Sequence, residues 1–356
     1  MDSIKNLFET EIIMTPVEAG YKMPPEWDKH ERTFMEWPVK EAMWPGDLTE
    51  IHNSYAKIVK AISEFEPVSL IVRPDLLLEA KSYCGDFAEF IQIEHDDSWM
   101  RDNGPTFVID SNGNIAGINW IFTGWGGKFP AEKDNEVASK LLKILDIKAF
   151  DLPLVMEGGS FHTDGEGTLL TTRECLLNDN RNPDMTQEQI EEVLMNCLGV
   201  NKIIWLNKGL FGDDTDGHID NSACFARPGE IIMLSCSDKN DPNYEIFMEN
   251  YEILKNSTDA KGRSFEISLI EQPVPVLFDD VRQTYSYLNF YFVNDGIILP
   301  IFGGESSDRD EMAVKELEKI FPDRKIRTIE GCVVARGGGN VHCLTQQMPL
   351  YKNTRI

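Results

Sequence analysis

The sequence has few cysteines and no long apolar runs. Seven cysteines are scattered among 356 residues, and no two of them form a Cys-x-x-Cys pair. An odd, scattered set argues against a disulfide framework or a zinc knuckle and favours a reducing compartment. No stretch approaches the roughly 18 to 20 apolar residues that a membrane-spanning helix needs, and no N-terminal run resembles a signal peptide. We therefore expect a cytoplasmic protein with no membrane partner.

Basic residues are also scarce relative to acidic ones. The chain has 34 lysines and arginines against 60 aspartates and glutamates, which gives a formal net charge of -26. Nucleic acid is therefore an unexpected partner, because phosphate binding needs clustered basic side chains. An acidic surface can serve solubility alone, or it can attract a small cation. Composition leaves these two interpretations open.

What the sequence does contain is a repeated plan in a chain long enough for two domains or one large repeated architecture. Four segments each begin with a small polar cluster and continue as a strand, a turn with glycine, a second strand, a helix and a third strand. The predicted turns are Asn112-Gly113, Asp164-Gly165, Pro228-Gly229 and Asp295-Gly296. Helical spacing of apolar residues predicts helices over 137–145, 190–197, 246–254 and 313–321.

The polar clusters recur at similar intervals. They are Asp102-Asn103-Gly104, Glu157-Gly158-Gly159, His218-Ile219-Asp220-Asn221 and Ser286-Tyr287-Leu288-Asn289, and Cys343 comes where a fifth should open. The successive spacings, counted through Tyr287, are 55, 61, 69 and 56 residues. A fifth unit has no room after Cys343, but a strand at 34–37, a helix at about 48–64 and a strand at 68–72 can complete it.

Units at a regular period that close by joining the chain ends indicate a ring. We therefore expect one catalytic domain over residues 1–356, made of five ββαβ modules, with the module around Cys343 completed by N-terminal residues. Equivalent strand starts converge on the axis of such a ring. The five polar clusters could then share one site.

The fifth cluster is the one best equipped for chemistry. It is Gly337-Gly338-Gly339-Asn340-Val341-His342-Cys343, in which three glycines allow the backbone to approach a ligand closely. A cysteine in this position is a nucleophile, a metal ligand or a buried filler. Together with Asp102, Glu157, His218 and Asp220 it would supply a nucleophile, an acid/base and three carboxylates.

Three carboxylates are costly to bury together unless they share a positive partner. A guanidinium suits them because it is planar, always charged and able to pair with carboxylates through two N–H groups at once. Its central carbon is also an electrophile. Cation binding and attack by cysteine therefore point to the same functional group, a small cationic guanidine.

Five motifs in this order resemble the guanidino-group-modifying enzymes of the pentein superfamily, most closely the agmatine deiminases. They are Trp99-Met100-Arg101-Asp102-Asn103-Gly104-Pro105, Trp125-Gly126-Gly127, Glu157-Gly158-Gly159-Ser160-Phe161-His162, Gly217-His218-Ile219-Asp220 and Gly337-Gly338-Gly339-Asn340-Val341-His342-Cys343. The resemblance implies an α/β fold, a five-bladed α/β propeller with pseudo-fivefold symmetry. It also implies hydrolysis of agmatine to N-carbamoylputrescine and ammonia through a cysteine thiouronium intermediate, in polyamine biosynthesis. The resemblance implies no metal or organic cofactor. It does imply a homo-oligomer.

The resemblance also implies roles for individual residues. Cys343 would be the nucleophile and His218 the general acid/base, with Glu157 in support. Asp102 and Asp220 would hold the guanidinium, and Trp99 would pack on the aliphatic part of the substrate. The complete expected substrate-binding set is Trp99, Asp102, Asp220, Asp214, Gly338 and Gly339.

Two segments depart from the family pattern. The segment 125–130 is shorter than the loop that many agmatine deiminases have there. The run Asp213-Asp214-Thr215-Asp216 also differs from the glutamate-containing form of well-known members of the family. Both are expected near the far end of the substrate. Free or peptidyl arginine, or another guanidine, therefore remains an alternative substrate.

Two other classes of protein remain open. A metal-dependent hydrolase would draw on His218, Asp216, His342 and Cys343, which have suitable ligand atoms but no standard ligand spacing. A non-catalytic binding protein of the same fold would be expected to lack the nucleophile or the base.

Three further expectations concern neighbours of these residues. Cys175 lies in an apolar run and is interpreted as a small core residue. If the segment around Cys343 is extended, His342 points away from it, because neighbouring side chains alternate between faces. Carboxylates near Cys343 should raise the pKa of its thiol, and a bound guanidinium should lower that pKa.

Overall fold

A computed structural model describes residues 14–39, 44 and 46–352. Within these residues, five sheets of three or four strands share one arrangement. In each sheet a first strand pairs antiparallel with a second, and the second pairs parallel with a strand that follows a helix. The orders are β1-β5-β6-β7, β10-β9-β8, β11-β12-β13, β16-β17-β18 and β19-β2-β3-β4.

The strands are β1 (Tyr21–Lys22), β2 (His30–Glu36), β3 (Val68–Val72), β4 (Glu89–Gln92), β5 (Thr106–Asp110), β6 (Ile115–Ile121), β7 (Lys148–Val155), β8 (Phe161–Thr163), β9 (Thr168–Thr172), β10 (Lys202–Leu206), β11 (Ala223–Arg227), β12 (Glu230–Ser235), β13 (Glu266–Glu271), β14 (Leu277–Phe278), β15 (Val281–Arg282), β16 (Tyr291–Val293), β17 (Gly296–Ile301), β18 (Lys325–Glu330) and β19 (Thr345–Pro349). The α-helices are α2 (Leu48–Ser63), α3 (Leu77–Cys84), α4 (Met100–Asn103), α5 (Gly124–Gly127), α6 (Val137–Leu145), α7 (Arg173–Leu176), α8 (Gln187–Leu198), α9 (Pro242–Lys255), α10 (Ser307–Ile320) and α11 (Cys332–Ala335).

The helices predicted from the repeat are confirmed, and so are three of the four turns. Three of the predicted turns lie between β5 and β6, β8 and β9, and β11 and β12. The fourth is shifted by one residue, because the turn between β16 and β17 is Asn294-Asp295 and Gly296 is the first residue of β17. Helices α6, α8, α9 and α10 follow those hairpins. Helix α8 begins with a reciprocal capping box between Thr186 and Gln189, and it ends at Gly199 in the left-handed region, with φ of 72°.

The two ends of the chain meet in one sheet. Strand β19, which begins two residues after Cys343, pairs antiparallel with β2, so that Thr345 lies opposite Met35. Strand β2 then pairs parallel with β3, after helix α2. The outermost parts of the predicted domain, residues 1–13 and 353–356, lie outside the described residues.

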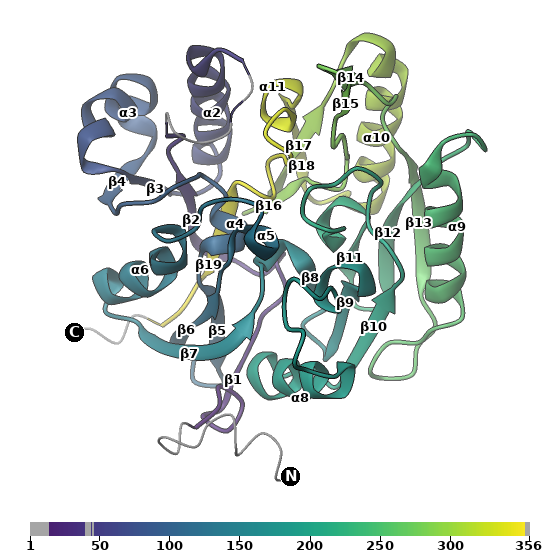
Figure 1. Cartoon of the computed structure of the whole chain (residues 1–356), viewed down its shortest axis with the longest axis horizontal. Helices are drawn as coiled ribbons and strands as arrows, with labels where there is room; N and C mark the ends of the chain where they lie inside the picture. The colour runs from purple at the N-terminus through teal and green to yellow at the C-terminus, as the bar shows by residue number, and fades with distance from the viewer. Residues whose placement is uncertain (1–13, 40–43, 45, 353–356) are drawn as a thin grey trace.

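The sheets are arranged around a centre (Figure 1). Helices α2, α6, α8, α9 and α10 lie on the outside, whereas the short helices α4 and α5 lie in the middle. Buried apolar residues form clusters between each sheet and its helix, for example around Leu141 and Leu142 of α6. The polar clusters immediately precede β5, β8, β11, β16 and β19, and this position brings them to the centre.

Some elements lie outside the predicted units. They are α3 with β4, which extend the N-terminal sheet, and the hairpin β14–β15 between β13 and β16. One local prediction was wrong: residues 341–344 form turns instead of an extended strand. No helix among the described residues combines the length and the apolar character that crossing a bilayer requires.

Candidate active site

Three predicted site residues meet at Gly159, in the short 3-10 helix η4 (Gly158–Ser160). A methyl group on Gly159 would lie 2.6 Å from His218 Nδ1 and 2.9 Å from both Asp102 Oδ1 and Asp220 Oδ2. The aspartates precede β5 and β11, so their contact depends on two different sheets. Glycine is required here because any side chain would occupy the space that these groups share.

Cys343 completes this group of residues. Its side chain is buried, and its Sγ accepts a hydrogen bond from Asn289 Nδ2 at 3.0 Å. On another side, Sγ lies 3.4 Å from Asp220 Oδ2. Burial first, and then the carboxylates of Asp220 and Asp102, raise the pKa of the Cys343 thiol well above its usual value. The expected direction of this pKa shift is confirmed.

His218 is fully buried and lies between two carboxylates. Its Nδ1 is 3.7 Å from Asp102 Oδ1, and its Nε2 is 3.6 Å from Glu157 Oε2. Neither ring nitrogen has a hydrogen-bond partner. Burial alone would lower the pKa of His218, but Asp102 and the groups around Nε2 outweigh it and raise that pKa well above the usual value.

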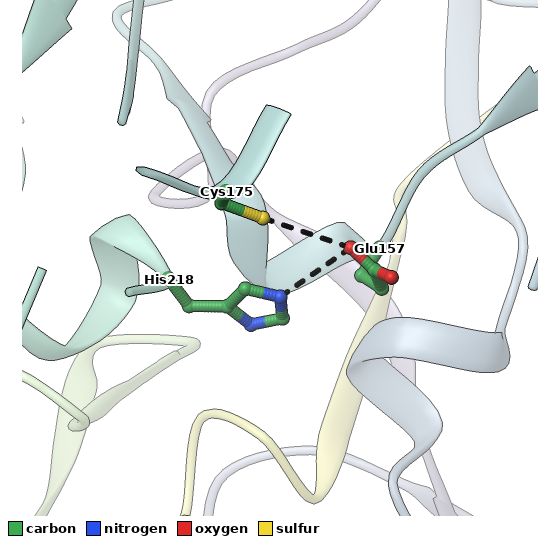
Figure 2. A group of neighbouring side chains, drawn as sticks. All are labelled: Glu157, Cys175 and His218. Carbon is green, nitrogen blue, oxygen red and sulfur yellow. Dashed lines mark hydrogen bonds and ion pairs between the residues drawn. The ribbon is translucent and has the colours of Figure 1, made fainter. Parts of the chain in front are cut away.

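Cys175 is a second cysteine at this site. Figure 2 shows its thiol and the His218 ring approaching the same oxygen of Glu157, and Sγ lies 3.8 Å from Oε2. The expectation of a small buried residue is confirmed. Its interpretation as core filler was incomplete, because the thiol contacts the carboxylate that faces the proposed base.

Glu157 and Asp220 each have a close partner that is positive or can become positive. Arg181 Nε donates to Glu157 Oε1 at 2.7 Å, and Glu157 has a lowered pKa, because His218 and Arg181 outweigh the raising effect of burial. His342 Nδ1 lies 2.9 Å from Asp220 Oδ2. The pKa of Asp220 is likewise lowered, since His342 outweighs burial.

His342 is held in turn by Glu26, whose two carboxylate oxygens lie 3.0 and 2.9 Å from Nε2. His342 therefore contacts the same Asp220 oxygen as the Cys343 thiol, instead of being isolated from the site by strand alternation. The reason is that the glycine-rich segment ends in turns, where side chains do not alternate between two faces.

Asp102 is the carboxylate whose hydrogen bonds come from neutral donors. Gly159 N–H donates to Oδ1 and Trp125 Nε1 donates to Oδ2, each at 2.9 Å. Burial raises the pKa of Asp102, although His218 partly opposes this. Trp125 therefore positions a carboxylate at the site.

A cavity of about 510 Å³ reaches Cys343 from the surface. One wall is aromatic, with Trp44 and Trp99 stacked 5.2 Å apart at 19°. Gly338 lines it with φ of 103°, a conformation that favours glycine. The lining residues are Trp44, Asp97, Trp99, Asp102, Trp125, Phe129, Asp214, Thr215, Phe278, Asp279, Val281, Gln283, Arg336, Gly337, Gly338, Gly339 and Cys343.

Five of the six predicted substrate-binding residues therefore line this cavity. Asp220 does not line it, but lies against Cys343. His218 and Glu157 are also fully buried behind the lining residues. Sequence reasoning missed Arg181 and Glu26, which no periodic signal marks, whereas Asn289 belongs to the fourth polar cluster and could have been found from it.

The metal set considered from the sequence does not form. Asp216 accepts hydrogen bonds from Arg181 and Lys128, at 2.7 and 2.6 Å, so its carboxylate oxygens pair with cationic side chains. Among the residues that the structure describes, one group has ligand atoms within 4.8 Å of one another: Glu157, Cys175 and His218.

Sequence and structure comparisons agree about the relatives of this chain. A Legionella pneumophila protein provisionally named an agmatine deiminase is 48% identical over 337 residues, with 94% of this chain and 96% of the relative covered. The agmatine deiminase of Stutzerimonas stutzeri is 41% identical over 365 residues, with 96% and 98% covered. The solved structure of the Enterococcus faecalis agmatine deiminase matches with a TM-score of 0.90 and 34% identity, over 95% of this chain and 98% of the other.

Fold and site thus define an α/β protein of the agmatine deiminase type, in the pentein superfamily, which confirms the resemblance seen in the five motifs. The family described as Porphyromonas-type peptidyl-arginine deiminase matches residues 22–349. The chain belongs to this family.

Proposed function

We propose that this protein is an agmatine deiminase, a hydrolase that converts agmatine and water to N-carbamoylputrescine and ammonia. The observation that carries the proposal is the position of Cys343. Its sulfur lies at the cavity floor, with Asp102, Asp220 and His218 grouped beside it around Gly159. The relatives named agmatine deiminase support the choice of reaction.

The guanidinium would bind between Asp220 and Asp102. Asp220 Oδ1 is buried without a hydrogen bond, and a guanidinium N–H could donate to it. Asp102 borders the cavity and would pair with the same planar cation from another side. The central carbon of the substrate would then face Cys343 Sγ.

Substrate binding would also activate the nucleophile. The thiol pKa is raised by burial and nearby carboxylates, and a cation placed among those carboxylates lowers it. The thiolate attacks the guanidinium carbon and forms a C–S bond. His218 gives a proton to one nitrogen, the C–N bond breaks, and ammonia leaves a thiouronium adduct.

Hydrolysis of the adduct would reuse the same residues. Neutral His218 takes a proton from water as the water oxygen attacks the thiouronium carbon. Collapse of this second tetrahedral intermediate breaks the C–S bond and releases the ureido product. Glu157 keeps His218 in position. The hydrogen bond from Arg181 keeps Glu157 ionised in both steps of the reaction.

We further propose that the five sheets form a five-bladed propeller with pseudo-fivefold symmetry, within one catalytic domain. The common strand order of the five sheets supports this arrangement. Seven free cysteines suit a reducing compartment such as the cytoplasm, where the nucleophile stays reduced. A role in polyamine biosynthesis and a homo-oligomeric state complete the proposal.

The test is ammonia release from agmatine, free arginine and a blocked peptidyl arginine, each with wild-type protein and with Cys343→Ala. Turnover of agmatine alone, abolished in the variant, is the expected result. Preference for either arginine substrate would keep deimination and change the substrate. Turnover by Cys343→Ala equal to wild type would overturn the mechanism.

A further inference from the structure

Cys175 has no step in the proposed reaction, yet its thiol lies among reacting groups. Its side chain is fully buried, as are those of Glu157 and His218. Figure 2 shows the Cys175 thiol and the His218 ring converging on Glu157 Oε2, from different elements. A thiol, an imidazole and a carboxylate are together the donor set of a zinc site with an open fourth position.

From these contacts we propose that Glu157, Cys175 and His218 form an inhibitory binding site for a thiophilic divalent cation such as Zn²⁺. The site is distinct from the nucleophile, because it uses Cys175 instead of Cys343. It also differs from a metal cofactor site, because occupation would stop the reaction.

The spacing of the ligand atoms supports this assignment. Two ligands of a tetrahedral zinc ion lie about 3.3 to 3.5 Å apart, given metal–ligand bonds of roughly 2.0 to 2.3 Å. Here Glu157 Oε2 is 3.6 Å from His218 Nε2 and 3.8 Å from Cys175 Sγ. Small side-chain movements would therefore complete three bonds.

The histidine is also prepared for a metal. Both of its ring nitrogens are buried without a hydrogen-bond partner, so Nε2 is available beside Glu157 and Cys175. On the opposite ring nitrogen, Nδ1, Asp102 Oδ1 lies 3.7 Å away. Asp102 thus lies on the side of the ring where metal-binding histidines usually donate their second N–H to a carboxylate.

Charge balance favours the ion despite the nearby Arg181. That arginine occupies Glu157 Oε1 at 2.7 Å and leaves Oε2 for another partner. When metal binding displaces the Cys175 proton to solvent, the thiolate, Glu157 and Asp102 carry three negative charges. These balance the charges of Arg181 and a divalent ion.

Occupation would block proton transfer at His218. A metal on Nε2 takes the lone pair of that nitrogen, so the ring can no longer be protonated at both nitrogens. The acid step of the reaction requires that doubly protonated form. Inhibition therefore follows from the geometry without any contact between the metal and Cys343.

Binding is tested first with Co²⁺ as the probe, in Cys343→Ala protein, where the nucleophilic thiol is gone. We expect one equivalent with a thiolate-to-cobalt charge-transfer absorbance. The band should disappear on adding Cys175→Ser, which keeps the size and a hydrogen-bond donor, and should persist on adding Cys197→Ala. Cys197 is a buried free thiol of helix α8. Loss of the band in Cys343→Ala alone would overturn the proposal, as would its persistence with Cys175→Ser.

Two further measurements complete the test. X-ray absorption of zinc-loaded Cys343→Ala protein should show one sulfur ligand at about 2.3 Å and does not depend on Cys175→Ser folding. In the otherwise wild-type protein, Cys175→Ser should raise the Zn²⁺ concentration for half-inhibition roughly tenfold or more, relative to each protein's zinc-free rate. Absence of sulfur, or an unchanged inhibition constant, would contradict the site. The spectroscopic results do not depend on the substrate of the enzyme.

Discussion

Gly159→Ala is the substitution that tests the geometry of the site most directly. The added methyl carbon would lie 2.6 Å from His218 Nδ1 and 2.9 Å from Asp102 Oδ1 and Asp220 Oδ2. Gly159 does not have a positive φ, so alanine adds no backbone strain. The whole effect of this substitution should therefore come from steric contact with the three groups.

The size of the effect follows from the overlap. Ordinary contact distances begin at about 3.4 Å, so the histidine must move by about 0.8 Å and each carboxylate by about 0.5 Å. Displacements near 1 Å at a reacting centre cost on the order of 100-fold in rate. We expect kcat/KM for deimination to fall about 100-fold, equivalent to about 2.7 kcal/mol of transition-state stabilisation.

Steady-state ammonia release provides the assay, and Gly117→Ala provides the control. Gly117 lies in β6, also without a positive φ, and a methyl there would be 2.3 Å from Leu142 Cδ2 in the core. That variant should lose stability, by about 1 to 3 kcal/mol, with kcat/KM little changed. If Gly159→Ala retained wild-type kcat/KM, the grouping of base and carboxylates at this point would be refuted.

Three further predictions concern charged and nucleophilic groups. A non-reactive guanidine that leaves the sulfur accessible should accelerate alkylation of Cys343, because burial and nearby carboxylates raise its thiol pKa in the free protein; a thiolate ultraviolet absorbance already complete without ligand would count against this. Glu26→Gln should lower Tm at neutral pH. Burial would raise the pKa of Glu26, but its histidine and arginine partners hold that pKa well below 4.5. The ionised carboxylate therefore stabilises the fold above pH 4.5, and the Tm difference between the two proteins should narrow as the pH falls below that value. A Tm difference that widens on acidification would refute the sign. Arg181→Gln should cost about 3 to 5 kcal/mol in urea unfolding because it leaves Glu157 buried without its cation, and the double variant with Glu157→Gln should recover part of that loss; an undiminished loss would exclude this cause.

The sequence predicted those features of the site that follow from the repeat. Asp102, Glu157, His218 and Cys343 each precede the first strand of a sheet, so their periodic spacing carried three-dimensional information. The same reasoning predicted the hairpins and outer helices, since local turn and apolar patterns specify them. It also anticipated the pairing of the chain ends through β19 and β2.

Other features depend on contacts that no periodic pattern records. Arg181 lies in the loop before α8, which has no helical or strand period, and its contact with Glu157 depends on how that loop folds back toward the start of β8. Glu26 reaches His342 from a segment far away in the sequence. The direction of His342 was misjudged because strand alternation was assumed for residues that form turns.

The uneven compensation of the buried carboxylates has a consequence for the reaction cycle. Glu157 has Arg181 and Asp220 has His342, but the hydrogen bonds to Asp102 come from neutral donors, so burial leaves its pKa raised. Asp102 borders the cavity and keeps a raised pKa despite His218, so an incoming cation there stabilises its ionised form. Deimination converts that cation to a neutral ureido group, which removes the charge pairing with Asp102 and with the free oxygen of Asp220. The proposed reaction thus weakens the contacts that held its substrate, and product release follows from the same electrostatics that favoured binding.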